Sequence, residues 1–516
     1  MRRVRLLLAT ALAAHLLVAA ATTSSATTTD SLASQHTSPG PWDWPTYGHD
    51  AQHTFHGRTT LTPAVAPRLS KAWFFPTGDA VTATPTVVAG TVYVGSWDTF
   101  FYAIDLLSGR LRWRFPLDPQ PAVSPQPGHL PRDISSDGGM VTSSAWYEPG
   151  QGHRPDLIIF AGGFTLYALE ARTGHPYWKH RYTGQPDRPA DPAHDSTRIF
   201  SSPVVADAKV LFGVSADGDR GRRGYVAAAS LTTGRPVWVR ETDVDLHGRI
   251  LNDGCGNVWS SGTVLPKPGL VVFDEGDCHF SNPPPLSETV FALRIRDGHL
   301  AWIYRPKRHD TRCDLDFGAT VNAGITNDGT PTFLGVGAKD GTYYSLDPRT
   351  GKARWHTNVV FGGFSGGFIA TSAYDGQRVF GSTAIGDFGR FEGAGSVHCA
   401  PGNPRDLEMQ EPSAHAFDAR TGAVVWQANA SAAFGPTTVS GGLTFHGVAL
   451  RPVVQIRNSK TGRLLAELAL QAPCWSGIAT VGNALVLGTG ASQQGSPDGV
   501  LAFTPGGSPP IVPGTR

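Results

Sequence analysis

Cysteine is scarce and scattered in this chain of 516 residues. It has five cysteines, no two of them adjacent and no pair in C-x-x-C spacing. Structural zinc sites and covalently attached c-type haem both depend on closely spaced cysteines, in the second case the motif C-x-x-C-H. The spacing therefore argues against a zinc centre and excludes a covalent haem.

Other absences narrow the class of protein further. With 43 basic and 42 acidic residues there is no excess of either charge, and no basic patch interleaved with aromatic residues occurs. The sequence therefore predicts no nucleic-acid partner. It contains no glycine-rich loop ending in G-K-[ST], and no Ser-His-Asp ordering stands out, which disfavours a phosphate-binding loop and a serine hydrolase. No long stretch has the 3.6-residue period of a helix.

What the chain does contain is a repeat. Alternating apolar residues lead to a turn glycine, and a tryptophan follows four residues later, a pattern that predicts two strands joined by a tight turn. The six full copies end in Gly109 and Trp113, Gly174 and Trp178, Gly234 and Trp238, Gly298 and Trp302, Gly351 and Trp355, and Gly422 and Trp426. His415 stands in an aromatic position of its copy, where we expect it to serve packing. The spacing between copies leaves room for a four-stranded unit plus one loop.

Two further units are incomplete. A seventh copy has Ala466 in the tryptophan position, and an eighth begins at Leu501 without reaching a tryptophan. The segment from Leu69 to Phe75 contains Trp73 and resembles the missing last strand of that eighth unit. The sequence therefore predicts an all-β fold, an eight-bladed β-propeller of four-stranded blades, closed by pairing of its N- and C-terminal strands.

The N-terminus has the features of a secretion signal. Arg2, Arg3 and Arg5 precede an apolar run and a site rich in small residues. We expect a signal peptide at 1–26, a disordered linker at 27–41, the propeller domain at 42–506 and a flexible tail at 507–516; an uncleaved anchor is the alternative for the first segment. The mature chain is then secreted or extracytoplasmic and has no membrane span.

Five cysteines in an exported protein imply two disulfides and one free thiol. Cys255 and Cys278 flank two strands and are positioned to meet across a hairpin end. Cys399 and Cys474 lie in later loops and form the second expected pair, which leaves Cys313 free. The alternative is that Cys278 pairs with Cys313.

The repeat and the opening segment together carry a family resemblance. Tyr102-Ala103-Ile104-Asp105 leading to Trp113, with Trp44-Pro45-Thr46-Tyr47-Gly48-His49-Asp50, resembles the pyrroloquinoline quinone (PQQ) dehydrogenases, especially the polyvinyl alcohol dehydrogenase branch. The resemblance spans Trp44 to Pro505. It implies PQQ held in the axial funnel, a calcium ion beside it and hydride transfer from an alcohol.

Four segments match the family's funnel residues. Residues 213–226 resemble the loop that carries a calcium-binding Glu, with Asp219, or less well Asp217, in that position. Trp259 matches the residue that stacks on the quinone, and Asp277 matches the second calcium ligand. Each assignment has a structural alternative. The first segment is then an exposed turn rich in Asp and Gly, and Trp259 is a tryptophan of the hydrophobic core.

The third segment, residues 309–319, contains Asp310, Asp314 and Asp316, and Asp310 best matches the catalytic base. The fourth contains Lys339, matching a lysine that contacts the quinone oxygens. The alternative for the three aspartates is that their carboxylates cap loops or pair with arginine. The alternative for Lys339 is an ordinary lysine of a turn before a strand.

The chain also departs from the family pattern. It lacks the adjacent cysteine pair, Asp replaces both the Glu and the Asn of the calcium site, and several repeats have lost their acid. Two interpretations therefore remain: a PQQ- and calcium-dependent alcohol dehydrogenase acting on a small-molecule alcohol or polymer with the electron acceptor left open, or a non-catalytic propeller that binds a protein, peptide or carbohydrate.

Overall fold

A computed structural model describes most of the chain. The described residues are 36–118, 141–182, 198–216, 223–251, 253–276, 278, 283–306, 315–360, 362, 366–384, 413–490 and 498–514. Among them, no helix combines the length and the apolar character needed to span a bilayer. The only helical element in these ranges is a single 3-10 turn, η1 (Ala66–Arg68).

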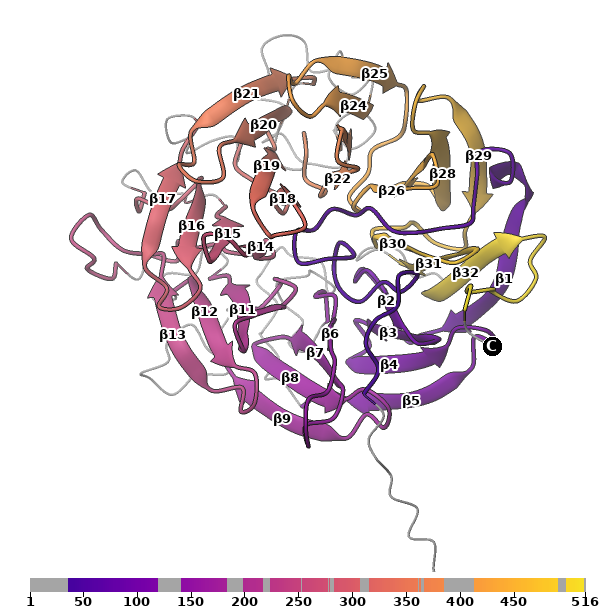
Figure 1. The fold of residues 1–516 in the computed structure, drawn as a ribbon, viewed down its shortest axis with the longest axis horizontal. Coiled ribbons are helices and arrows are strands. Elements are labelled where there is room, and N and C mark those ends of the chain that lie inside the picture. The colour runs from indigo at the N-terminus through magenta and orange to yellow at the C-terminus, as the bar shows by residue number, and fades with distance from the viewer. Residues whose placement is uncertain are drawn as a thin grey trace, which may run out of the picture. The chain divides into compact units, whose positions relative to one another are not determined.

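The described strands form eight four-stranded antiparallel sheets arranged in a ring (Figure 1), which confirms the predicted eight-bladed propeller. Blade 1 consists of β2 (Thr86–Val88), β3 (Thr91–Gly95), β4 (Phe100–Asp105) and β5 (Leu111–Pro116), and blade 2 of β6 (Trp146–Glu148), β7 (Leu157–Gly162), β8 (Thr165–Glu170) and β9 (Pro176–Arg181). Blade 3 consists of β10 (Val204–Ala206), β11 (Lys209–Val214), β12 (Tyr225–Ser230) and β13 (Pro236–Glu241), and blade 4 of β14 (Thr263–Leu265), β15 (Leu270–Asp274), β16 (Val290–Arg294) and β17 (Leu300–Tyr304).

The second half of the ring repeats this order from the axis outwards. Blade 5 consists of β18 (Asn322–Ile325), β19 (Pro331–Gly337), β20 (Thr342–Leu346) and β21 (Ala353–Asn358), and blade 6 of β22 (Ala373–Tyr374), β23 (Arg378–Ser382), β24 (Ala414–Asp418) and β25 (Val424–Ala428). Blade 7 consists of β26 (Thr438–Ser440), β27 (Leu443–Gly447), β28 (Val453–Asn458) and β29 (Leu464–Ala469), and blade 8 of β30 (Ile478–Val481), β31 (Ala484–Thr489), β32 (Gly499–Pro505) and β1 (Leu69–Pro76).

Blade 8 closes the ring by joining the two ends of the repeat region. The first strand, β1, pairs antiparallel with the last, β32, in a register that places Lys71 opposite Phe503 and Phe74 opposite Leu501. This is the closure that the position of Trp73 predicted. Because β1 pairs with β32, the outer edge of β32 is covered and blade 8 has the same four strands as the other blades.

Burial follows the position of a strand in its blade. The two middle strands are almost wholly buried, because neighbouring blades cover both of their faces; β7 is buried at all six positions. The outermost strands alternate between exposed and half-buried residues, as in β5 and β21. The hydrophobic core is therefore a series of layers between blades rather than one central mass.

Each tryptophan of the repeat packs against the next blade. The indole Nε1–H of Trp113, for example, donates to the carbonyl of Ala171 at 3.1 Å, and its ring lies on Gly174. A Cβ added to Gly174 would lie 2.6 Å from the ring, and the residue has φ of +74°, so both space and backbone conformation require glycine there. A β-bulge in the outer hairpin, between Ala103 and Ile104 in blade 1, adjusts the register beside the tryptophan.

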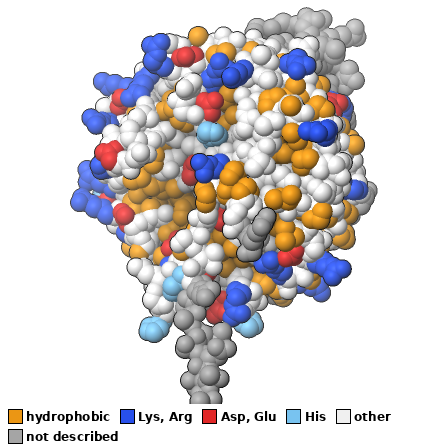
Figure 2. Space-filling model, turned by 45° about the vertical axis from the view of Figure 1, so that its right-hand side comes forward, with side chains coloured by type: hydrophobic (Ala, Val, Ile, Leu, Met, Phe, Trp, Pro, Cys, Tyr) orange, Lys and Arg blue, Asp and Glu red, His pale blue; other side chains and the backbone are white. Residues whose placement is uncertain are grey.

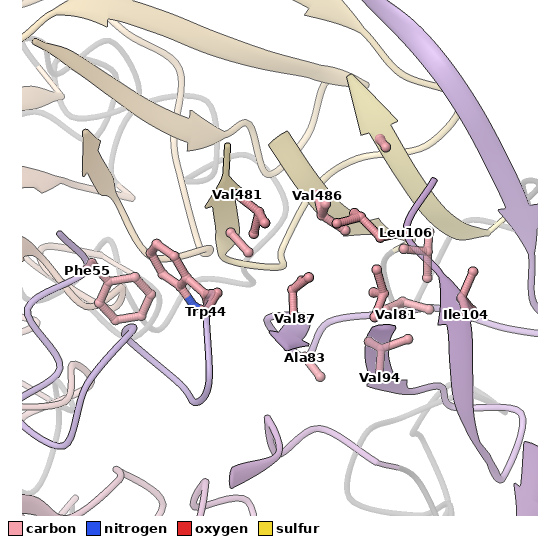
Figure 3. Packing of buried hydrophobic residues seen from close by; sticks show 14 of the residues in the cluster. Trp44, Phe55, Val81, Ala83, Val87, Val94, Ile104, Leu106, Val481 and Val486 are labelled. Atoms are coloured by element: carbon pink, nitrogen blue, oxygen red, sulfur yellow. The ribbon is translucent and has the colours of Figure 1, made fainter. Parts of the chain in front are cut away.

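An N-terminal segment, residues 44–60, crosses the centre of the ring before β1 begins (Figure 1). Within the described residues, its backbone exchanges hydrogen bonds with seven of the eight blades, all except blade 3; the contacts include Trp44 with Val87 of blade 1 and Phe55 with Val439 of blade 7. Figure 3 shows Trp44 and Phe55 next to each other, in a cluster that also holds Val87 of β2 and Val481 of β30. We call residues 44–60 the axial segment.

Ahead of the propeller strands, the Thr37 N–H donates to Asp156 at 3.0 Å. Near the other end, the Ile511 N–H donates to Asn483 at 2.6 Å. The domain boundaries expected at residues 26, 41 and 506 stay predictions.

Candidate functional site

A cavity of about 560 Å³ lies on the axis of the ring, in the size range of small-molecule sites. All eight blades contribute residues to its wall, and Tyr47 of the axial segment contributes one more. Its lining is mainly aromatic, aliphatic and hydroxyl side chains, and among the described residues the charged side chains that line it are Asp316 and Lys339.

These two charges form a buried ion pair. The Nζ atom of Lys339 lies 2.9 Å from Oδ1 of Asp316, and their side chains are 7% and 2% exposed. The same ammonium lies 5.3 Å from the centre of the Trp259 ring, within the range of a cation–π contact. The structure thus brings two of the predicted site residues, Trp259 and Lys339, together at one cavity and adds Asp316.

The four segments identified from the sequence all reach this cavity. Ser215 of the first segment donates its hydroxyl to Asn257 at 3.2 Å, close to Trp259 of the second. Gly276, also in the second, lies between Trp259 and Asp316, because a Cβ there would be 3.0 Å from Nε1 of one and Oδ2 of the other. The missing side chain lets Trp259 and Asp316 both pack closely against this position.

A second feature of the cavity was not predicted: a row of hydroxyls, which we call the hydroxyl belt. In blades 1 to 6 a Ser or Thr lies two residues before the innermost strand, and in the first five of these blades its backbone N–H donates to the hydroxyl of the next blade at 2.9 to 3.1 Å. The belt consists of Thr84, Ser144, Ser202, Ser261, Thr320 and Thr371. A Ser or Thr recurring just before each short inner strand is the sequence signal that identifies it.

Burial shapes the electrostatics beneath the cavity. The carboxyl of Asp274 is fully buried, and burial raises its pKa well above the usual value, with a further increase from the nearby charge of Asp316. Burial also raises the pKa of Tyr47 to about 12, so its hydroxyl keeps its proton and hydrogen-bonds with Thr371 at 2.9 Å. The neutral hydroxyls and the ammonium of Lys339 suit a ligand rich in oxygen acceptors.

Three predicted site residues lie outside the described residues: Asp219, Asp277 and Asp310. Among the described residues, no group of three or more His, Cys, Asp or Glu side chains is arranged to hold a metal ion. The calcium ligands and the catalytic base therefore stay predictions.

Of the two predicted disulfides, one is confirmed and one is wrong. Cys255 and Cys278 form a disulfide, as expected, which rules out the alternative pairing of Cys278 with Cys313. The expected bond between Cys399 and Cys474 is wrong: Cys474 is a free thiol, fully buried, and contacts the Ser476 carbonyl at 3.4 Å. Burial also raises its pKa to about 12. Cys313 and Cys399 lie outside the described residues.

Comparison with known proteins gives two overlapping family matches. The model of the glucose/ethanol/alcohol dehydrogenase β-propeller domain, the PQQ model, matches residues 44–359. That of the outer membrane protein assembly factor BamB matches residues 286–507.

Individual relatives agree with the first match. The chain is 23% identical over 380 residues to a polyvinylalcohol dehydrogenase of a Pseudomonas species, covering 66% of this chain and 55% of that protein. It is 24% identical over 451 residues to the dehydrogenase subunit of a quinone-linked alcohol dehydrogenase of Gluconacetobacter polyoxogenes, covering 80% and 57%. The chain thus spans somewhat more than half the length of these relatives.

A solved structure shows the same fold. A europium-containing methanol dehydrogenase superposes with a TM-score of 0.67 over 90% of this chain and 98% of its own, at 17% identity.

Proposed function

Because the chain belongs to the glucose/ethanol/alcohol dehydrogenase β-propeller family, we propose that it is a quinoprotein dehydrogenase that oxidises an alcohol with PQQ bound in the axial cavity. The observation that carries the proposal is the position of Lys339, held between Asp316 and the face of Trp259 in a cavity that every blade lines. PQQ, when bound, supplies the electrophilic carbon that accepts a hydride.

The residues present fit this planar, acidic molecule. The Trp259 indole offers a flat apolar face at the cavity wall. Lys339 donates to quinone oxygens and stabilises the negative charge that they gain on reduction. The hydroxyl belt offers donors for carboxylates, and Asp316 keeps the ammonium oriented.

For the residues outside the described ranges, the proposal follows the family resemblance. Asp310 is the base that takes the proton of the substrate hydroxyl, and Asp219 and Asp277 hold a calcium ion. The substrate is a small alcohol or a polymer that bears hydroxyl groups, and the chain works outside the cytoplasm once its signal peptide is removed. The electron acceptor is left open.

The experiment is reconstitution of the purified protein with PQQ and Ca²⁺, followed by absorbance titration and dye-linked oxidation of simple alcohols. Trp259→Leu leaves the ion pair in place and should weaken PQQ binding at least about tenfold, through loss of the stacking face. Lys352→Met, at an exposed position of blade 5 between β20 and β21, is the control and should bind PQQ like the unchanged protein.

Two more variants test the roles assigned by resemblance. Asp310→Asn should abolish turnover with PQQ still bound, whereas Asp277→Ala should weaken both metal and PQQ binding. If PQQ with Ca²⁺ fails to bind at high micromolar concentration, the dehydrogenase proposal is wrong. The alternative of a binding propeller, to which the match with BamB also points, then takes its place.

A further inference from the structure

The disulfide between Cys255 and Cys278 joins two segments that form one wall of the axial cavity. Residues 255–261 lead into β14, and Gly276 and Cys278 follow β15. Five of the residues that line the cavity lie between the two cysteines in the sequence: Asn257, Trp259, Ser260, Ser261 and Gly276. The disulfide therefore closes a covalent loop that includes this wall.

Trp259 rests on the junction of the two segments. A Cβ added to Gly276 would lie 3.0 Å from Nε1 of Trp259, so the indole packs against the backbone two residues before Cys278. The Gly276 N–H donates to the carbonyl of Asn257 at 3.0 Å, two residues before Trp259. Water replaces a backbone hydrogen bond at small net cost, whereas a covalent bond prevents the two segments from separating. The disulfide is therefore the stronger of these two links.

The blade itself is held together by other contacts. β14 pairs with β15, and β15 pairs with β16, along ladders that do not involve the disulfide. The indole N–H groups of Trp238 and Trp302 join blade 4 to its two neighbours at 3.0 and 3.2 Å. We therefore expect the propeller to stay folded without the disulfide, with the change confined to the cavity wall.

The outer surface contributes less to ligand selection than this wall does. Figure 2 shows that basic and acidic side chains both occur on the face drawn there, among hydrophobic and uncharged ones. A face of mixed charge exerts little long-range attraction on an anionic ligand. Affinity therefore depends on the local geometry of the cavity.

We propose that the Cys255–Cys278 disulfide is a redox control of the axial cavity that acts through the position of Trp259. With the bond formed, Trp259 lies against Lys339. A dithiol reductant breaks the bond by supplying two electrons and two protons, which leaves two thiols here and a disulfide in the reductant. Residues 255–261 are then free to move relative to Gly276, and the affinity for the ligand falls. The identity of that ligand, PQQ, rests on the proposed function.

Burial links the ligand to the reduction of the bond. Cys255 and Cys278 are 1% and 2% exposed, so a reductant reaches their sulfur atoms only after the wall opens. A ligand that holds Trp259 in place opposes this opening. Because coupling between two sites is reciprocal, bound PQQ should make the disulfide harder to reduce by the same factor by which the closed disulfide favours PQQ binding.

The first test needs no ligand and uses the whole protein labelled with 5-fluorotryptophan. The fluorine resonance of Trp259 is identified by its loss in Trp259→Leu. Cys255→Ala combined with Cys278→Ala should shift or broaden this resonance and speed amide exchange at residues 255–261, with exchange in β16 and β17 unchanged. Gly506→Ala, which adds a Cβ at φ of +67° in blade 8, is the matched control for lost stability and should change neither signal.

The second test is titration with PQQ in the presence of Ca²⁺. The double cysteine variant should bind PQQ at least about tenfold more weakly than the unchanged protein. In the Trp259→Leu background the same two substitutions should cause little further loss, because the effect passes through Trp259. Dithiothreitol titration of the unchanged protein should need more reductant when PQQ is bound.

The proposal is overturned if the Trp259 resonance and the exchange of residues 255–261 stay as in the unchanged protein, or if the double variant binds PQQ equally well. It is also overturned if the loss of affinity persists in full in Trp259→Leu, because the effect then passes through the neighbouring Asp277 instead. If the unchanged protein does not bind PQQ, the dehydrogenase proposal fails, while the fluorine and exchange measurements still decide whether the disulfide positions Trp259.

Discussion

At the scale of single residues, His415 shows how a repeat position changes its chemistry when it is buried. It occupies the position of Tyr102 and Phe291 in other copies and is fully buried beside Phe417. Its Nδ1 accepts a hydrogen bond from Gln427 at 3.1 Å, which requires this nitrogen to be unprotonated. Burial lowers the pKa of His415 to about 3.

This lowered pKa makes folding stability depend on pH. The unfolded histidine takes up a proton below about pH 6.5, whereas the folded one does so only near pH 3. The contribution to stability is therefore complete above pH 6.5 and is lost as the pH falls towards 3. His415→Phe should reduce the loss of unfolding free energy between pH 7 and pH 5 by about 2 kcal/mol.

Chemical denaturation at a series of pH values measures this effect. The exposed His175 provides the control, because His175→Phe should keep the pH dependence of the unchanged protein. Equal slopes for His415→Phe and the unchanged protein would contradict the prediction.

At the scale of strands and blades, the contact between tryptophan and glycine is the unit that repeats. Gly174 and Gly506 have similar positive φ values, +74° and +67°, but only Gly174 lies under an indole ring. Comparing the two separates the cost of the backbone conformation from the cost of the clash.

We expect Gly506→Ala to cost about 1–2 kcal/mol, the price of a left-handed conformation for a residue with a Cβ. Gly174→Ala should cost about 1–3 kcal/mol more, because the added methyl displaces Trp113. Denaturant unfolding of both variants, and of Gly174→Ala combined with Trp113→Leu, measures the difference. If the two glycine variants lose equal stability, the indole does not press on the turn.

At the scale of the whole molecule, the N-terminal part of the chain stabilises the ring in two ways. The axial segment bonds to seven blades, and β1 then completes the eighth. Removing residues 36–60 should lower stability but keep the closing blade. Removing residues 36–76 also removes β1 and exposes the edge of β32, so it should abolish cooperative unfolding and cause association.

Thermal unfolding and light scattering distinguish these outcomes. Removal of residues 509–516, which takes away the contact of Ile511 with Asn483, is the control and should cause only a small loss. A protein without residues 36–76 that still unfolds in one sharp transition would show that closure by β1 is not essential.

The sequence by itself determined the number of blades, the outer hairpins and the closing role of Trp73. These follow from local signals, since alternation, a turn glycine and a recurring tryptophan are read within a dozen residues. The resemblance also identified Trp259 and Lys339, which the structure brings together. Asp219, Asp277 and Asp310 stay predictions, because they lie outside the described residues.

Only the tertiary structure decided which residues meet across blades. Trp113 follows Gly109 in the sequence but packs on Gly174, and the hydroxyl belt joins residues that lie far apart in the chain. Asp316, not singled out from its segment, is the partner of Lys339, and Cys474 is a free thiol. Such contacts depend on the position of each blade around the axis, and the local pattern of one repeat carries no information about the side chains of the next.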